Sequence, residues 1–232
     1  MEKSKIKAII FDLDGVITDT AEFHYIAWKN LANRIGIDFD RTFNENLKGI
    51  SRMESLELIL EQGGMTDRFS EAEKMALATE KNNEYVGLIN HITPADILPG
   101  ILDFLQELKG RGIKTAIASA SKNAPAIVEK LELRHFFDYI ADAGAIPNPK
   151  PAPDIFLVSA AFLEAHPSEC VGIEDAAAGV EAIKAAHMMA VGIGAAEHLG
   201  GADLILDQTA ELSLERISNA FSEFKNGGNA QK

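Results

Sequence analysis

The chain has 232 residues, of which 47% are apolar and 25% are charged, so it can bury a sizeable core as one large domain or two small ones. Its formal net charge of −13 excludes the dense basic surface that a nucleic-acid backbone requires, and its single cysteine excludes an internal disulfide. No apolar run is long enough to span a bilayer, and residues 1–5 lack the apolar segment of a signal peptide, so we expect a cytoplasmic protein without a membrane partner.

The first predicted element is a strand over residues 6–11, where an isoleucine-rich apolar run favours burial on both faces. The run stops at Asp12 and Asp14, and Gly15 lets the chain turn away from the sheet. Two carboxylates this close repel each other and raise one pKa, unless a cation lies between them or one of them is protonated. The pair therefore predicts either a divalent metal site or a carboxylic acid that can donate a proton.

A block of helices follows and interrupts the alternation of strands and helices. Apolar residues at helical spacing predict a helix over residues 23–35 that ends at Gly36. The segments Ser51–Glu54 and Ser70–Glu73 have the form of capping boxes, and each predicts the start of a further helix. Because this block shows no strand pattern, we interpret residues 18–92 as a separate helical cap inserted into the chain.

From residue 93 onward, strands and helices alternate. Further strands are expected at residues 114–118, 139–141, 171–173, 189–191 and 204–206. Helices are expected between them, near residues 101–110, 124–131, 155–162 and 177–186. The alternation predicts an α/β fold, a Rossmann-like parallel sheet with helices on both faces. Its core comprises residues 1–17 and 93–225, and the polar, glycine-rich residues 226–232 are expected to form a flexible tail.

Polar residues stand at the ends of several expected strands. Ligands in such folds bind at the carboxyl ends of parallel strands, where Asp12 and Asp14 already lie. Ser119 ends the second expected strand, ahead of a helix, so its hydroxyl and the following amides suit phosphate oxygens, although an ordinary helix cap is the alternative. Glu174 and Asp175 end another strand, and an isolated pair of this kind usually reflects the preference of acids for a helix N-terminus.

Lys150 lies in a loop with a proline at every second position from Pro147 to Pro153. Because proline fixes φ, the loop is stiff and extended, and the ammonium group is held at little further entropic cost. A lysine held in this way can neutralise a neighbouring anion. The alternative is a rigid surface loop that carries a solvated lysine.

These segments, in order from Phe11 to Asp175, resemble the four motifs of the haloacid dehalogenase superfamily in its phosphotransferase form. The resemblance implies that Asp12 is a nucleophile that forms an aspartyl phosphate and that Asp14 is the general acid and base. It implies that the transferring phosphoryl group is held by Ser119, Ala120 and Lys150. It also implies a magnesium cofactor with the ligands Asp12, Asp14, Glu174 and Asp175, of which Glu174 either binds the metal or orients the other ligands.

The cap is similar to that of the sugar phosphomutases in this superfamily. The residues that carry the likeness are Thr20, His24, Trp28, Lys48, Gly49 and Arg52, joined in the core by Ser121, Lys122 and Asn123. By this resemblance Arg52 and residues 121–123 bind the phosphate that is not transferred, Lys48 contacts the sugar, and His24 and Thr20 couple cap closure to Asp14. The implied protein is a monomeric isomerase that interconverts β-D-glucose 1-phosphate and D-glucose 6-phosphate through bound glucose 1,6-bisphosphate.

Two other functions stay open at this point. A sugar-phosphate or phosphoglycolate-type phosphatase would use the same scaffold but would admit water to the aspartyl phosphate. A regulatory phospho-acceptor also places an aspartate at a strand end near a lysine, although the cap and the second acid at Asp14 argue against it. The loops at residues 144–147 and 194–201 match the phosphomutases less clearly than the motifs do.

Overall fold

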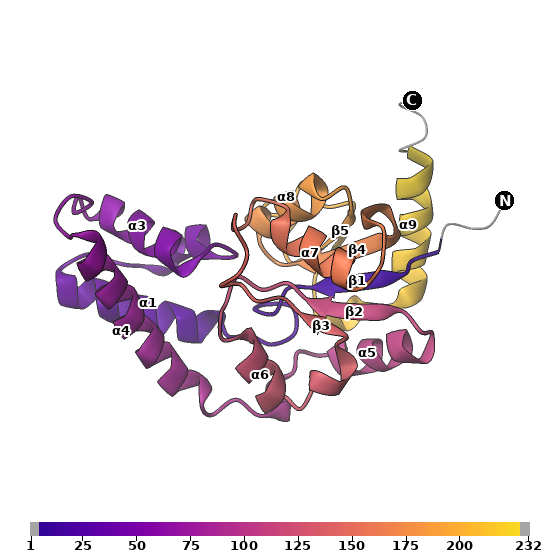
Figure 1. The fold of residues 1–232 in the computed structure, drawn as a ribbon, viewed down its shortest axis with the longest axis horizontal. Coiled ribbons are helices and arrows are strands. Elements are labelled where there is room, and N and C mark those ends of the chain that lie inside the picture. Colours follow the sequence, from indigo (N-terminus) through magenta and orange to yellow (C-terminus); the bar gives the residue numbers. More distant parts are fainter. Residues whose placement is uncertain (1–4, 228–232) are drawn as a thin grey trace.

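The computed structural model describes residues 5–227, which form an α/β core and a helical cap (Figure 1). All six strands of the sheet run parallel, in the order β3-β2-β1-β4-β5-β6. They are β1 (Ala8–Phe11), β2 (Lys114–Ile117), β3 (Tyr139–Ile140), β4 (Cys170–Glu174), β5 (Met189–Ile193) and β6 (Leu204–Leu206). The fold class predicted from the sequence is confirmed.

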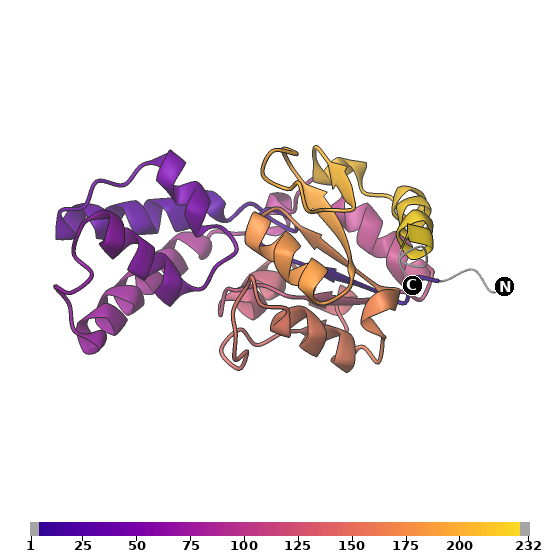
Figure 2. The same ribbon diagram turned by 90° about the horizontal axis from the view of Figure 1, so that it is seen from above.

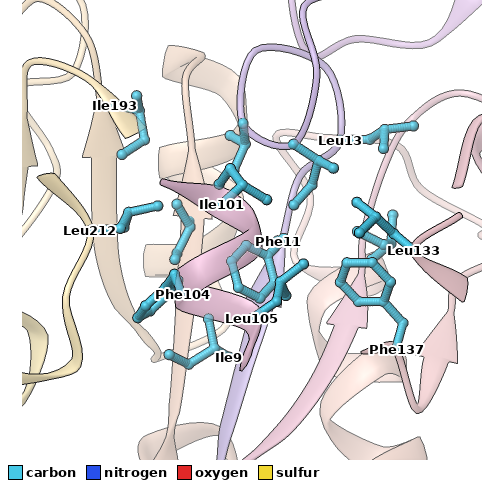
Figure 3. Packing of buried hydrophobic residues seen from close by; sticks show 14 of the residues in the cluster. Ile9, Phe11, Leu13, Ile101, Phe104, Leu105, Leu133, Phe137, Ile193 and Leu212 are labelled. Atoms are coloured by element: carbon cyan, nitrogen blue, oxygen red, sulfur yellow. The ribbon is translucent and has the colours of Figure 1, made fainter. Parts of the chain in front are cut away.

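Core helices cover both faces of this sheet (Figure 2). They are α5 (Ile101–Gly110), α6 (Ala124–Lys130), α7 (Asp154–Phe162), α8 (Ala177–Ala185) and α9 (Leu214–Gly227). Alternate residues of β1 face two separate apolar clusters. Ile9 and Phe11 pack with α5 and α9, where Phe11 meets the ring of Phe104 edge-on (Figure 3), whereas Ala8 and Ile10 pack with α7 and α8. The central strand is therefore buried on both faces, and this packing fixes the position of Asp12, the residue that follows it.

The cap has an apolar core of its own. It is built from α1 (Ala21–Ile35), α2 (Arg41–Asn44), α3 (Arg52–Gln62) and α4 (Glu71–Ile89). Gly36 ends α1 in the left-handed conformation, with φ of 82°. Ser51 caps α3 by accepting a hydrogen bond from the amide of Glu54, and Ser70 and Glu73 form a reciprocal capping box at the start of α4. These local signals explain why the cap helices begin where the sequence predicts.

Two chain segments join the cap to the core, and they lie beside each other. The hydroxyl of Thr18 donates a hydrogen bond to the carbonyl of Asp96 at 2.8 Å. The amide of Leu98 donates to the carbonyl of Ile17 at 3.0 Å. The two crossings therefore form one hydrogen-bonded connection between cap and core. The domain limits at residues 18 and 92 stay a prediction.

The C-terminal part differs from the expectation. The sequence predicts a tail from residue 226, but α9 continues to Gly227, and residues 228–232 lie outside the described part. The apolar positions Ile217, Phe221 and Phe224 recur at helical spacing, and the first two are buried in the core, so packing holds a helix that the glycine-rich composition obscures. None of the helices within residues 5–227 has the length and apolar character needed to cross a bilayer.

Candidate active site

A cavity of about 390 Å³ lies between the cap and the carboxyl ends of the strands. Most of the residues that the sequence analysis singled out line it: Asp12, Asp14, His24, Trp28, Lys48, Gly49, Arg52, Ser119, Ala120, Ser121, Lys122, Asn123 and Asp175. Lys150 and Glu174 are buried, and Lys150 contacts both Glu174 and Asp12. Thr20 is fully buried and is not part of the cavity wall, so its role at Asp14 stays a prediction. Thr20 is the residue before α1, at the point where the chain enters the cap.

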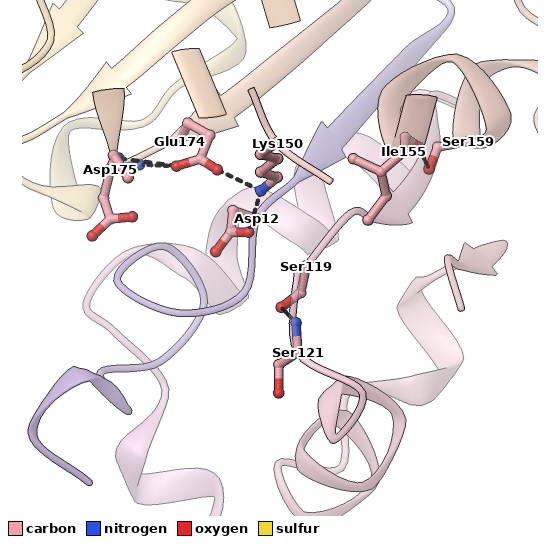
Figure 4. A network of polar contacts seen from close by, with 9 residues as sticks. Asp12, Ser119, Ser121, Lys150, Ile155, Ser159, Glu174 and Asp175 are labelled. Carbon is pink, nitrogen blue, oxygen red and sulfur yellow. Dashed lines mark hydrogen bonds and ion pairs between the residues drawn. The ribbon is translucent and has the colours of Figure 1, made fainter. Parts of the chain in front are cut away.

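Lys150 joins two carboxylates beside the cavity (Figure 4). Its Nζ lies 2.6 Å from Oδ1 of Asp12 and 2.5 Å from Oε1 of Glu174, and its side chain is only 1% exposed. Burial alone would lower the pKa of Lys150, but the two carboxylates raise it above its usual value. The ammonium group therefore stays charged next to Asp12, and the alternative of a solvated surface lysine is excluded.

Glu174 uses both of its carboxylate oxygens. Oε1 accepts from Lys150, and Oε2 accepts from the backbone amides of Asp175 and Ala176, each at 2.9 Å. A Cβ atom on Gly179 would lie 1.8 Å from Oε1, so only a glycine leaves room for this carboxylate. Glu174 does not line the cavity. Of the two roles expected for it, the structure favours orienting Lys150 and Asp175 over direct binding of a metal.

Three carboxylates at the cavity wall fit a cation. Oδ1 of Asp14 is buried without a hydrogen-bond partner among residues 5–227. Burial, and then the charge of Asp12, raise the pKa of Asp14 to about 8. Burial, and then Glu174, raise the pKa of Asp175 well above its usual value. A cation would offset this repulsion. In the described part of the chain, however, no three His, Cys, Asp or Glu side chains are spaced as metal ligands.

The segment after β2 presents a series of hydroxyl and amide groups. Oγ of Ser119 accepts from the amide of Ser121 at 3.1 Å, and Oγ of Ser121 accepts from the amide of Asn123 at 3.2 Å. The side-chain amide of Asn123 donates to Oδ1 of Asn82, on α4 of the cap, at 2.9 Å. The hydroxyl groups therefore stabilise the turn before α6, as ordinary caps do, and the same residues also line the cavity.

Arg52 and Lys122 line the cavity at its cap side and its core side. Neither Arg52 nor Lys122 forms an ion pair with any residue in the range 5–227. Burial lowers the pKa of Arg52, which is the first residue of α3. Lys48 differs, because its Nζ lies 2.8 Å from Oε2 of Glu45. Arg52 and Lys122 can therefore bind an anionic group inside the same cavity that holds Asp12.

Lys81, on α4, is a cavity residue that the sequence analysis did not identify. Its side chain is buried, and its Nζ lies 2.7 Å from Nδ1 of His24. The ammonium group also lies over the rings of Trp28 and Tyr85, 4.6 and 4.9 Å from their centroids. Burial lowers the pKa of Lys81 to about 7, and burial together with Lys81 holds the pKa of His24 well below its usual value. His24 is therefore neutral, and its Nδ1 accepts a hydrogen bond from Nζ of Lys81.

Comparisons with known proteins identify related chains. The sequence profile of the haloacid dehalogenase-like hydrolases matches residues 6–187. The chain is 50% identical over 220 residues to a β-phosphoglucomutase of Bacillus subtilis, covering 95% of this chain and 97% of that one. It is 32% identical over 186 residues to a fructose-1-phosphate phosphatase of Escherichia coli, covering 80% and 95%. The crystal structure of β-phosphoglucomutase from Clostridium difficile matches with a TM-score of 0.93 at 53% identity, covering 95% and 99%.

Proposed function

The chain belongs to the haloacid dehalogenase-like hydrolase family, and we propose that it is a phosphomutase that interconverts β-D-glucose 1-phosphate and D-glucose 6-phosphate. The observation that carries the proposal is the pair of cations, Arg52 and Lys122, that line the same cavity as Asp12 without carboxylate partners within residues 5–227. A phosphatase needs to bind only the phosphate that it removes. A mutase that works through glucose 1,6-bisphosphate must bind a second phosphate, and these two cations can bind it.

The proposed reaction uses Asp12 and Asp14 in sequence. A carboxylate oxygen of Asp12 attacks the phosphorus, the bond between phosphorus and the sugar oxygen breaks, and Asp14 gives its proton to that oxygen. In the other half of the reaction, Asp14 removes the proton from a sugar hydroxyl, the oxygen of that hydroxyl attacks the phosphorus of the aspartyl phosphate, and the bond between phosphorus and Asp12 breaks. Lys150 keeps a positive charge 2.6 Å from Asp12, and Ser119 lines the same cavity as Asp12.

We propose magnesium as the metal, bound by the carboxylates of Asp12 and Asp175 and by the backbone carbonyl of Asp14. These are hard oxygen donors of the kind that magnesium prefers. The ion would withdraw charge from the phosphoryl oxygens and so make a weak carboxylate nucleophile sufficient. The cytoplasmic location and the monomeric state remain predictions from the sequence.

A coupled assay tests the function. With β-glucose 1-phosphate, magnesium and a trace of glucose 1,6-bisphosphate, we expect glucose 6-phosphate to form without stoichiometric release of phosphate. Phosphate release without glucose 6-phosphate would instead select the phosphatase, which the 32% identity to the Escherichia coli enzyme keeps as the second candidate.

An Arg52→Ala variant tests the second phosphate site. Losing a charged hydrogen-bonding partner should lower mutase turnover by roughly tenfold or more, while hydrolysis of acetyl phosphate, which has no second phosphate, should change little. Arg68→Ala is the matched control, because Arg68 is an exposed arginine of the cap that does not line the cavity. Equal losses of both activities in Arg52→Ala would contradict the role of Arg52.

A further inference from the structure

The hydrogen bond between Asn123 and Asn82 crosses the cavity from the core to the cap. We propose that Asn82 is a positioning residue of the phosphomutase, whose Oδ1 fixes the amide of Asn123 and so ties closure of the cap to the segment that binds the second phosphate. The inference rests on the function proposed above and deepens it. Asn82 acts through Asn123 and not on a reacting group.

The position of Asn82 on α4 supports a coupling role. Its neighbour Lys81 contacts His24 at 2.7 Å, on the cap side of the cavity, whereas Asn82 contacts Asn123 at 2.9 Å, on the core side. Lys81, Asn82, His24 and Asn123 all line the cavity. Two adjacent residues of one helix therefore hold groups on both sides of the site, and any displacement of α4 from the core breaks the second contact.

The chemistry of the amide explains what Asn82 can do for Asn123. The backbone of Asn123 is already held, because its amide donates a hydrogen bond to Oγ of Ser121, and the backbone amide of Ser121 donates to Oγ of Ser119. A side-chain amide carries two N–H donors. Asn82 accepts one of them, which orients the group and leaves the second N–H for an acceptor such as a phosphate oxygen. Fixing the side chain beforehand lowers the entropic cost of binding that phosphate.

A second contact between cap and core shows what remains if Asn82 is lost. Gly49, in the loop before α3, approaches the core so closely that an added Cβ atom would lie 3.1 Å from Cβ of Ala176. This contact is apolar and comes from a different part of the cap than α4. Without Asn82, the cap would still touch the core near Gly49, but the side near Asn123 would be free to open and admit water to the aspartyl phosphate.

The test compares Asn82→Ala with Asn83→Ala. Asn83 is the next residue of α4, has the same side chain, is exposed and does not line the cavity, so it controls for the loss of an asparagine from this helix. In Asn82→Ala we expect the KM for β-glucose 1-phosphate to rise about fivefold to tenfold, the size expected for one hydrogen bond. The ratio of phosphate released to glucose 6-phosphate formed should also rise, whereas the melting temperature should match that of Asn83→Ala.

A double-mutant cycle with Asn123→Ala isolates the pair. If the two side chains act together, the effect on KM of Asn82→Ala should nearly vanish in the Asn123→Ala background. Additive effects, or an Asn82→Ala variant whose KM and product ratio equal those of Asn83→Ala, would overturn the proposal. A parallel fall in all activities together with a lower melting temperature would also overturn it, because Asn82 would then serve only the fold.

Failure of the proposed function would look different. The unmodified protein would then release phosphate without forming glucose 6-phosphate. The KM comparison and the cycle could still be measured with the phosphatase substrate, so the contribution of Asn82 to cap closure would be decided separately.

Discussion

Lys81 and His24, which are 57 residues apart in the chain, lie with Nζ and Nδ1 separated by 2.7 Å. The contact joins α4 to α1 at the cavity wall. Because a buried ammonium group lacks water, it is bound here by an imidazole nitrogen and by the faces of Trp28 and Tyr85, with no carboxylate partner among residues 5–227. This arrangement makes the protonation of Lys81 sensitive to pH near neutrality.

The stability of the protein should therefore depend on pH through Lys81. Burial lowers its pKa from 10.5 in the unfolded chain to about 7 in the folded protein. Between these values the unfolded chain binds the proton and the folded protein does not, so the free energy of unfolding rises with pH, by up to about 1.4 kcal/mol per pH unit. Below pH 7 both forms are protonated and Lys81 adds no slope.

Urea unfolding between pH 8.5 and 10, in a chelator, measures this slope. Burial and the charge of Asp12 raise the pKa of Asp14 to about 8. Because the range lies above this value, the carboxyl group of Asp14 adds little to the slope of stability against pH. Lys81→Met should show a smaller slope than the unmodified protein. Lys74→Met is the control, because Lys74 lies on the same helix but is paired with Glu57, which raises its pKa. Equal slopes in all three proteins would contradict a Lys81 that is neutral above pH 8.

Gly49→Ala should weaken substrate binding by obstructing the contact between cap and core. Gly49 has φ of +75°, and its added Cβ atom would lie 3.1 Å from Cβ of Ala176. Gly64 provides a matched control in the cap, since its φ is +64° but nothing lies within 4 Å of an added Cβ atom. Both variants should lose about 1 kcal/mol of stability through backbone strain, whereas only Gly49→Ala should raise the KM for β-glucose 1-phosphate. An equal KM in the two variants would show that this contact plays no part in closure.

Gly15→Ala should weaken metal binding. An added Cβ atom on Gly15 would lie 2.1 Å from Oδ2 of Asp175, so the carboxylate would have to move away from Asp12 and Asp14. Calorimetric titration with magnesium should show at least roughly tenfold weaker binding, the size seen when the support of a metal ligand is disturbed. Gly36→Ala controls for strain, because Gly36 has φ of +82° with nothing within 4 Å. Unchanged magnesium affinity in Gly15→Ala would argue against Asp175 as a ligand.

Addition of a chelator should abolish turnover of the unmodified protein, and excess magnesium should restore it.

Most of the core could be predicted from the sequence because the physics of a buried parallel sheet is local. Strands covered on both faces appear as continuous apolar runs, such as residues 8–11 and 170–173, and polar residues follow at their carboxyl ends. Once the strands are parallel, Asp12, Ser119 and Asp175 must come to the same edge of the sheet. The structure brings all three to one cavity.

The cap side of the site could not be predicted in this way, because a lysine or an asparagine within a helix usually faces solvent. One signal for Lys81 does exist in the sequence. The buried residues of α4 recur every three or four positions, and they are Lys74, Ala78, Lys81, Tyr85 and Ile89. A lysine on the apolar face of a helix is unusual enough to suggest a function, but its contact with His24 depends on how α1 and α4 pack. Thr20 lies just before α1, and its position in the sequence does not reveal that its side chain is buried outside the cavity wall.

The paired crossings at Thr18–Asp96 and Ile17–Leu98 have a consequence for how such proteins diversify. The cap leaves and rejoins the sheet-bearing part of the chain at neighbouring points, after β1 ends and before α5 begins. A lineage can therefore lengthen, trim or exchange the entire cap without reordering a single strand. The core, which carries the residues for phosphoryl transfer, and the cap, which contributes to sugar binding, can therefore change independently during evolution.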